Sequence, residues 1–252
     1  MIMKLKVMTF NLRFRNEADG INIFDNRLPR VIEAIKTQAP DIVGFQEATD
    51  VMRAALRQSL DGYVLIGCGR KQNYRGEGLC IAYRKDAYEL IDYTTFWLSD
   101  TPNAPGSRYE NSDQSTCPRI TMAAKLSPDG YDGCITFINT HLDHKGAAAR
   151  LKGMKQIAGY MESVEGIYVL TGDMNALPDS PCIAVANSVK GARDLTADIK
   201  TTFHDFGRYK GDCKIDYIFT NAAPVCAYAV EDNPKDGVWI SDHYPVCAEI
   251  EI

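Results

Sequence analysis

The stretch Ile167-Tyr-Val-Leu-Thr-Gly-Asp-Met-Asn175 shows the pattern on which the fold depends. An apolar run, Ile167–Leu170, is followed within a few residues by a carboxylate, Asp173, and an amide, Asn175. Short runs that are apolar on both faces are typical of strands covered on both sides. In α/β folds, functional groups gather beyond the ends of such strands. The stretch therefore predicts a buried strand that delivers Asp173 and Asn175 to a site.

The same arrangement of an apolar strand with a polar end recurs along the chain and supplies further candidate site residues. They are Asn11 at the end of Lys4–Asn11, Glu47 after Asp41–Gln46, His141 at the end of Cys134–His141, Asp216 inside Ile215–Thr220, and Asp242 and His243 before Tyr244–Ile252. Each residue alone has an ordinary explanation as a turn or cap residue. Their recurrence at one strand end after another favours a single shared site.

Helical segments alternate with these strands. Apolar residues at i, i+3, i+4 and i+7 predict a helix over Asn26–Gln38. Further helices are expected from Thr49 or Asp50 to about Leu60 and over Gly146–Glu162, and further strands at Tyr63–Cys68, Leu79–Arg84, Tyr88–Leu98, Ile120–Leu126 and Val225–Val230. This alternation indicates an α/β protein in which sheets lie between layers of helices.

The composition excludes several classes of protein. The chain has 252 residues, of which 45% are hydrophobic, and a formal net charge of −5. We expect a single globular domain over residues 1–252. The longest apolar stretch, Ala222–Val230, contains Pro224 and is far shorter than the roughly 20 residues of a membrane-spanning helix. We therefore expect no membrane insertion. An acidic chain is poorly suited to hold long nucleic acid, so we expect no stable duplex DNA partner.

Cysteine spacing and the N-terminus bear on the compartment. The eight cysteines include no CxxC pair, which favours free thiols in a reducing compartment over a zinc site. The N-terminal residues alternate like a strand and do not resemble a signal peptide. We expect a cytoplasmic monomer; a secreted or periplasmic location stays open if a signal peptide has been removed.

Six short segments resemble, in their order along the chain, the motifs of the endonuclease/exonuclease/phosphatase superfamily. They are MTFNLRF from Met8, FQEAT from Phe45, NTHLDH from Asn139, GDMNALPDS from Gly172, KIDYIF from Lys214 and SDHYPV from Ser241. FWLSDTP from Phe96 and TFHDF from Thr202 are similar to a bacterial branch near the nocturnin/deadenylase-like members. The resemblance implies the deoxyribonuclease I-like fold, a four-layer α/β/β/α sandwich with two mixed sheets packed face to face.

The resemblance also implies roles for the candidate residues. It implies Glu47 as the main ligand of Mg²⁺ or Mn²⁺, Asn11 as a neutral amide at the same metal site, and Asp242 as a further ligand, direct or through water. Asp173 and Asn175 match the GDxN pair, so Asp173 orients or deprotonates the attacking water and Asn175 donates to the phosphoryl oxygens. His141 and His243 match the two phosphate-facing histidines.

Asp216 is expected to hold His243. A carboxylate partner favours the imidazolium, which suits stabilisation of negative charge better than proton abstraction. We therefore expect Asp173 to act as the base and His243 to act electrostatically.

Weaker candidates for substrate binding are Arg119, His204 and Asp143. Arg119 resembles a phosphate-reaching residue of some branches, and His204 either lines the pocket or lies in a turn. Asp143 is a candidate supporting carboxylate in the motif NTHLDH. The polar, aperiodic segment Ser99–Pro118 is long for a loop, and such loops are often functional. Our hypothesis is that it forms a lid.

These observations predict a metal-dependent phosphoesterase that acts by direct attack of water on a small phosphorylated compound or a short single-stranded end. The alternatives are a nuclease of the 3′-exonuclease or deadenylase type, acting on RNA or DNA, a hydrolase of inositol phosphates or lipid head groups, and a non-catalytic binding module on the same fold. The binding module is disfavoured because every candidate position carries a chemically competent residue.

Overall fold

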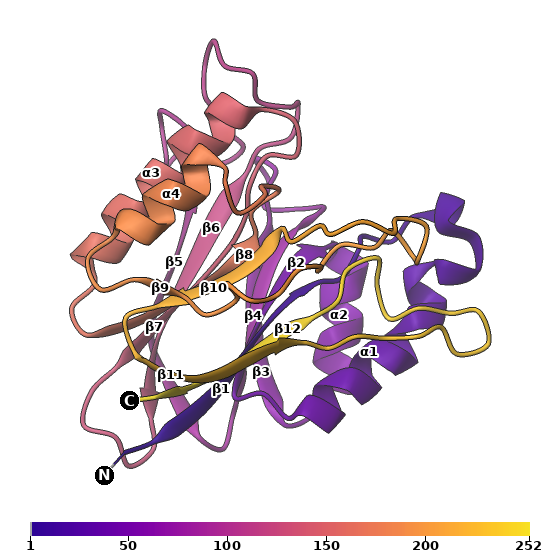
Figure 1. Ribbon diagram of the computed structural model, residues 1–252, viewed down its shortest axis with the longest axis horizontal. Helices are drawn as coiled ribbons and strands as arrows, with labels where there is room; N and C mark the ends of the chain where they lie inside the picture. The colour runs from indigo at the N-terminus through magenta and orange to yellow at the C-terminus, as the bar shows by residue number, and fades with distance from the viewer. Residues whose placement is uncertain (1) are drawn as a thin grey trace.

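Two six-stranded mixed sheets pack face to face between two layers of helices (Figure 1). The computed structural model describes residues 2–252. The predicted α/β/β/α sandwich is confirmed. The start of the first strand lies beside the end of the last strand, where Met3 and Ile252 exchange backbone hydrogen bonds.

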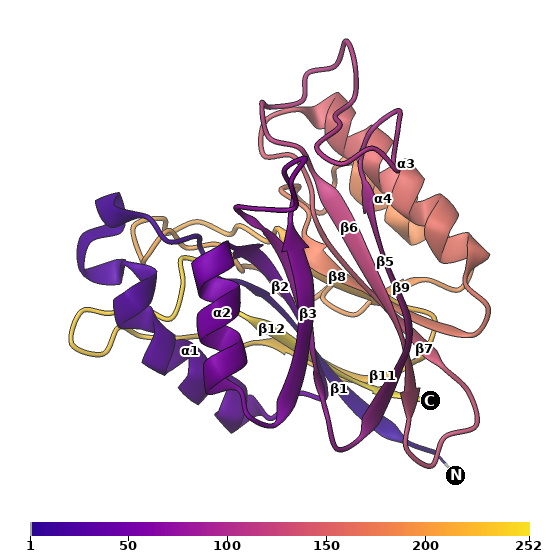
Figure 2. The ribbon, with the colours of Figure 1, turned by 180° about the vertical axis from the view of Figure 1, so that it is seen from behind.

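The first sheet has the strand order β11-β12-β1-β2-β4-β3. Its strands are β1 (Lys4–Asn11), β2 (Ile42–Ala48), β3 (Tyr63–Gly69), β4 (Gly78–Arg84), β11 (Ala223–Ala229) and β12 (Val246–Glu251). Helices α1 (Phe24–Gln38) and α2 (Asp50–Ser59) cover its outer face (Figure 2). β1 and β2 run parallel, and α1 is the long crossover that a parallel pair requires.

The second sheet has the strand order β5-β6-β7-β8-β10-β9. Its strands are β5 (Tyr88–Trp97), β6 (Ile120–Pro128), β7 (Ile135–His141), β8 (Ile167–Asp173), β9 (Arg193–Asp194) and β10 (Asp216–Thr220). Helices α3 (Ala147–Ser163) and α4 (Pro181–Ser188) cover its outer face (Figure 1). β7 and β8 are its parallel pair, joined through α3.

Apolar side chains fill all three spaces between the layers. The cluster between the sheets includes Val7, Ile81, Phe137 and Val169, all fully buried. Two further clusters lie between each sheet and its helices. Because both faces of the central strands are covered, their sequences are apolar at consecutive positions, as the pattern of Ile167–Leu170 predicts.

Some elements are absent from the sequence-based expectations. These are α4, the two-residue β9 and a 3₁₀ helix at Glu17–Asn22. The sequence of α4, PCIAVANS, is mostly apolar, so a period of 3.6 residues is not visible in it. The second strand also runs on past its predicted end at Gln46 and includes Glu47 and Ala48.

The expectations about cysteines and membranes have different outcomes. All eight cysteines are free thiols. Only three are buried, and Cys226 is exposed. Among residues 2–252, no helix is both long enough and apolar enough to cross a bilayer.

A buried polar seam joins the two sheets below the polar strand ends. Gln46 on β2 donates from Nε2 to Asn139 Oδ1 on β7 at 2.7 Å, and Asn139 donates from Nδ2 to Phe45 O at 2.9 Å. The sheets approach closely here, because a Cβ added at Gly44 would lie 2.6 Å from Thr171 Oγ1. The seam therefore sets the register of one sheet against the other.

Replacing Asn139 with alanine should destabilise the fold. The change removes three buried hydrogen bonds, one from Gln46 Nε2 and two from Asn139 Nδ2 to backbone carbonyls, and each contributes about 0.5–1.5 kcal/mol. We expect the free energy of unfolding in urea to fall by roughly 2–4 kcal/mol. Asn103→Ala, on an exposed loop, is the control and should stay within about 0.5 kcal/mol. Equal stability of the two variants would contradict the seam's role.

Candidate active site

Strand register places three of the candidate residues in one row. Asp173, at the end of β8, is paired with His141 on β7 and with Asp216 on β10. Residues paired directly across neighbouring strands project from the same face of a sheet. All three are almost completely buried. The second sheet alone therefore brings together a histidine and two carboxylates that are 75 residues apart along the chain at most, from 141 to 216.

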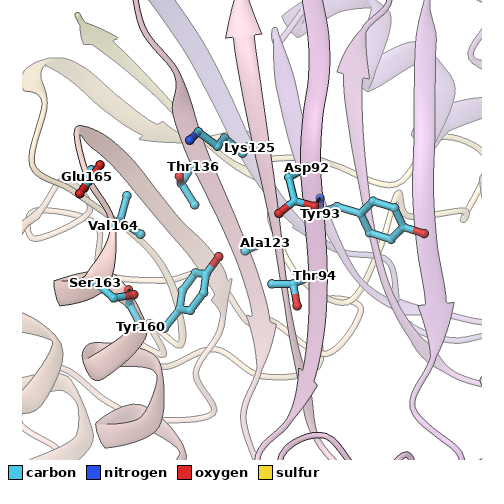
Figure 3. A pocket seen from close by; sticks show the side chains of 10 residues that line it. All are labelled: Asp92, Tyr93, Thr94, Ala123, Lys125, Thr136, Tyr160, Ser163, Val164 and Glu165. Carbon is cyan, nitrogen blue, oxygen red and sulfur yellow. Dashed lines mark hydrogen bonds between the residues drawn. The ribbon is translucent and has the colours of Figure 1, made fainter.

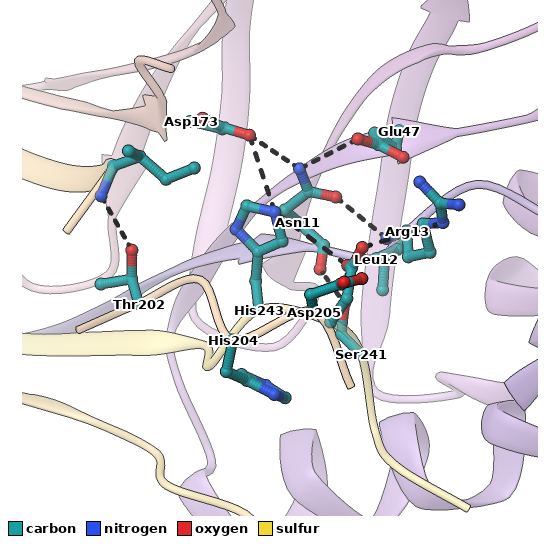
Figure 4. Close-up of polar contacts among 12 residues, drawn as sticks. Asn11, Leu12, Arg13, Glu47, Asp173, Thr202, His204, Asp205, Ser241 and His243 are labelled. Carbon is teal, nitrogen blue, oxygen red and sulfur yellow. Dashed lines mark hydrogen bonds and ion pairs between the residues drawn. The ribbon is translucent and has the colours of Figure 1, made fainter. Parts of the chain in front are cut away.

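The first sheet meets this row through Asn11. Its Nδ2 donates to Asp173 Oδ2 at 2.9 Å and to Glu47 Oε1 at 3.2 Å (Figure 4). Its Oδ1 accepts from the backbone N–H of Arg13 at 2.9 Å. Since a backbone N–H can only donate, the amide orientation of Asn11 is determined. Asn11 thus joins the carboxylate of one sheet to the carboxylate of the other.

Glu47 reaches the site from a distortion in β2. The pairing of β2 with β4 shifts between Phe45 and Ala48, and Glu47 itself has a φ of 59°. Such a bulge re-aims a side chain relative to a regular strand. Glu47 Oε2 accepts from the backbone N–H of Phe14 at 2.8 Å. Within residues 2–252, Glu47 takes part in no ion pair.

His243 is held by Asp216 in a buried ion pair. His243 Nδ1 lies 2.8 Å from Asp216 Oδ2, and the ring of Phe203 packs edge-on at 5.0 Å between centroids. Burial lowers the pKa of His243, but the charge of Asp216 and this hydrogen bond outweigh it and raise the pKa to about 10. His243 is therefore an imidazolium at neutral pH, as expected from the sequence.

At Asp173 and His141, in contrast, the surroundings favour the uncharged form of the side chain. Burial and the charge of Asp216 raise the pKa of Asp173 to about 7. Burial and the charges of Arg119 and Arg70 lower the pKa of His141 well below its usual value. His141 Nε2 lies 3.4 Å from Asp173 Oδ2. A neutral histidine thus faces a carboxyl group that can gain or lose a proton near neutral pH.

These side chains line one cavity of about 580 Å³. The predicted residues that line it are Glu47, Arg119, His141, Asp173, Asn175, Asp242 and His243. Asn11 and Asp216 lie behind them and act on the carboxylates and on His243. Asn175, at a φ of 46°, donates its backbone N–H to Asp173 Oδ1 at 2.8 Å.

Other cavity-lining residues had a weak signal in the sequence or none. Arg13 and Arg70 line the cavity together with Arg119. Phe14, Phe203 and Ile215 form an apolar part of its wall. All three lie within the motif segments, but an apolar residue inside a motif carries no sign that it will face a cavity.

Arg119 keeps unused hydrogen-bond donors at this cavity. Its Nη2 is 2.9 Å from His144 Nδ1, and its Nε is 3.6 Å from Asp143 Oδ2. Nε and Nη1 are buried and make no hydrogen bond within the described part of the chain. This environment is compatible with the predicted role in substrate binding.

Neither Asp143 nor His204 lines the cavity, although Asp143 lies beside the cavity-lining Arg119 as a supporting carboxylate. Asp143 does not line the cavity, because its oxygens accept from Ser115 and from the backbone N–H groups of Lys145 and Gly146. His204 also lies outside the cavity and stacks on Tyr244 at 4.1 Å between centroids. Burial lowers the pKa of His204 to about 4. Asp143 anchors a loop, and His204 is a neutral packing residue behind Phe203.

The segment Ser99–Pro118 forms part of the wall. Its Cys117 lines the cavity, and Asp143 holds its Ser115. Its Asp113 accepts hydrogen bonds from the backbone N–H groups of Ala148 and Ala149 at the start of α3. These anchors attach the segment to Asp143 and to α3 at the edge of the cavity.

A second cavity, of about 220 Å³, lies on the outer face of the second sheet (Figure 3). Asp92, Lys125, Thr136 and Tyr160 are among its lining residues, and none of the candidate catalytic residues is. Two carboxylates, Asp92 and Glu165, line it, but no histidine does. The chemistry is therefore concentrated in the larger cavity.

Two sets of side chains at the site offer donor atoms for a metal ion. Asp173, Asp216 and His243 offer ligand atoms within 4.8 Å of one another. However, a protonated His243 carries hydrogens on both ring nitrogens and cannot ligate a metal. Glu47 and Asp242 are the better set, because burial and the charge of Glu47 raise the pKa of Asp242, which a bound cation would relieve. Their donor atoms fit a hard divalent cation.

Comparison with known proteins identifies the family. A model described as the endonuclease/exonuclease/phosphatase family matches residues 8–243. The chain belongs to this family. Members of this family are typically hydrolases that act on phosphate esters and generally use divalent metal ions. The family assignment agrees with the resemblance seen in the sequence motifs.

Two solved structures are similar to nearly the whole chain, and one curated relative is similar to about half of it. An endonuclease/exonuclease/phosphatase from Bacteroides vulgatus is 32% identical, with a TM-score of 0.92 over 99% of both chains. A mannosyl-6-phosphatase of Bacteroides thetaiotaomicron is 24% identical, with a TM-score of 0.88 over 98% of this chain and 99% of that one. The uncharacterized protein L388 of Acanthamoeba polyphaga mimivirus is 25% identical over 146 residues, 55% of this chain and 54% of that protein. The chain thus matches about half the length of this curated relative.

Replacing Asp216 with asparagine should lower the pKa of His243 from about 10 towards its ordinary value of roughly 6.5. The variant keeps the shape of the side chain but removes the charge that favours the imidazolium. The measurement is a titration of the His243 ring nitrogens by NMR. Asp205→Asn, near His204 but without a contact to His243, is the control. An unchanged pKa in Asp216→Asn would contradict the ion pair.

Proposed function

We propose that the chain, as one catalytic domain over residues 1–252, is a phosphoesterase that depends on Mg²⁺ or Mn²⁺ and uses water as the nucleophile. The observation that supports this most is that carboxylates and positively charged side chains line one cavity. Glu47 and Asp242 present carboxylates for a cation, and the imidazolium of His243 presents a positive charge for phosphoryl oxygens. A phosphate ester between them would be neutralised from two sides.

The metal ion would be held by Glu47 and Asp242, with Asn11 holding Glu47 in place. Bound there, it would supply Lewis-acid stabilisation of the phosphoryl oxygens. His243 donates from Nε2 to a phosphoryl oxygen, and Asn175 donates to another. Asp216 keeps His243 protonated and oriented throughout.

Asp173 serves as the base. It accepts a proton from the water as the water oxygen bonds to phosphorus, and the ester oxygen leaves with the electrons of the broken bond and is protonated from solvent. A base works best when its pKa lies near the working pH, and the pKa of Asp173 is about 7. Asn11 and the backbone N–H of Asn175 hold the carboxylate in place. Neutral His141 lies beside it, with Nε2 at 3.4 Å from Asp173 Oδ2.

We propose a small phosphorylated compound, with a phosphorylated sugar as the first choice, as the substrate. Arg13, Arg70 and Arg119 can bind anionic or polar groups, and Phe14 and Phe203 give the remaining wall an apolar surface. The similarity to a mannosyl-6-phosphatase supports a sugar phosphate. The net charge of −5 disfavours long nucleic acid. We also propose that the protein is a cytoplasmic monomer with no membrane-inserted segment and no stable duplex DNA partner.

Glu47→Gln and Asp173→Asn should each reduce kcat/KM by about 10²–10⁴-fold without loss of folding. Glu47→Gln removes a charge from the metal site, and Asp173→Asn removes the base. Asp129→Asn, in an exposed turn, is the control and should keep full activity. The assay is phosphate release from sugar phosphates, nucleotides and aryl diesters with Mg²⁺ or Mn²⁺.

A parallel assay of oligonucleotide shortening separates a phosphatase from a nuclease. Shortening of oligonucleotides at a higher kcat/KM than any monoester would replace the proposed substrate with nucleic acid. Full activity of a purified, folded Asp173→Asn variant on the preferred substrate would contradict the proposed base.

A further inference from the structure

Arg27, on α1, is a fully buried arginine without a carboxylate partner. Its side chain has an exposed fraction of 0%, and no ion pair to it occurs within residues 2–252. Burial lowers the pKa of Arg27 to about 10, while the charges of Asp242, Asp19 and Glu47 oppose this shift. The guanidinium therefore stays charged at neutral pH. An unpaired buried charge is costly, so other contacts must stabilise it.

Backbone carbonyls provide those contacts. Nε donates to Asn22 O at 2.6 Å, Nη1 to Leu12 O at 2.6 Å and Ile240 O at 2.9 Å, and Nη2 to Arg13 O at 2.8 Å. The planar fork of a guanidinium can donate in several fixed directions at once, which an ammonium group cannot do. One side chain thus joins the segment after β1 and Asn22, just before α1, to the distant segment at Ile240.

Two of these segments lead directly to the metal-binding carboxylates. Leu12 and Arg13 follow Asn11, which binds Glu47. Ile240 lies two residues before Asp242. Ser241 Oγ also donates to Asn11 O at 2.6 Å, so the same two segments are joined a second time on the side of the site (Figure 4).

We propose that Arg27 is a positioning residue for the metal site. It holds the segment after β1 and the segment before β12 at a fixed separation, so that Glu47 and Asp242 are placed for one cation before the cation arrives. This inference rests on the proposed function, because it takes Glu47 and Asp242 as the ligands.

Another arginine of the same helix provides a matched comparison. Arg30 is also partly buried and donates to the backbone of the same connection, at Val238 and Asn233. It forms an ion pair with Asp232 at 2.7 Å and does not contact the segment after β1. Loss of Arg30 should loosen the connection before β12 without separating the two segments.

The test is the dissociation constant of Mn²⁺, measured by calorimetry without substrate, in the wild type and in Arg27→Met, Arg27→Lys and Arg30→Met. Removal of groups that orient metal ligands typically weakens metal binding about 10–100-fold. We expect a loss of about tenfold or more for Arg27→Met, a smaller loss of the same sign for Arg27→Lys, and a change of less than about twofold for Arg30→Met. The melting temperature without metal reports separately on folding.

A folded Arg27→Met variant with wild-type affinity for Mn²⁺ would overturn the proposal. If Arg27→Met does not fold, Arg27→Lys decides in its place: wild-type affinity in a folded Arg27→Lys variant would equally overturn it. Equal losses in the Arg27 and Arg30 variants would also overturn it, because they would reduce Arg27 to general stability.

Glu47→Gln is the reference for binding at the proposed site and should abolish it. A wild type that binds Mn²⁺ through Glu47 but hydrolyses no ester would overturn the proposed function and leave the role of Arg27 intact. A wild type whose Mn²⁺ binding does not depend on Glu47 would overturn both.

Discussion

The buried ion pair between Asp216 and His243 is the interaction on which the rest of the site depends. It joins β10 of one sheet to the segment that enters β12 of the other, at 2.8 Å. It also favours the imidazolium. Positive charge is thereby placed at His243, whose Nε2 lies 4.0 Å from Asp242 Oδ1, next to the carboxylates proposed to hold the cation.

The same pair determines the behaviour of Asp173. Its neighbour in the antiparallel register is Asp216, whose negative charge adds to burial and raises the pKa of Asp173. The strand register that builds the fold therefore also tunes the proposed base. Asn11 then bridges Asp173 and Glu47. This one residue therefore connects the two sheets and also connects the two halves of the site.

The positions of the principal site residues were predictable from the sequence because they depend on strand ends. Asn11, His141 and Asp173 each end an apolar run, and strands of a layered sheet bring such ends together. The resemblance to family motifs added the metal-binding role of Glu47 and the pairing of Asp216 with His243, which a strand pattern alone does not specify.

Other features depend on geometry that a linear pattern does not encode. Glu47 points into the cavity because of a bulge with a positive φ, although the sequence places it only after a strand. Asp143 and His204 carry polar groups in family-like motifs, but local hydrogen bonds and stacking occupy them outside the cavity. Arg27 lies among apolar positions of α1, where nothing in the helical period distinguishes a buried arginine from an exposed one.

The central claim is that the cation binds at Glu47 while His243 stays paired with Asp216. Diffraction from crystals soaked in Mn²⁺, with the anomalous signal used to locate the ion, tests it most directly. The predicted result is a peak at a coordination distance of about 2.1 Å from a Glu47 carboxylate oxygen, with His243 still hydrogen-bonded to Asp216. A peak coordinated by His243 together with Asp173 or Asp216, with none at Glu47, would contradict the account.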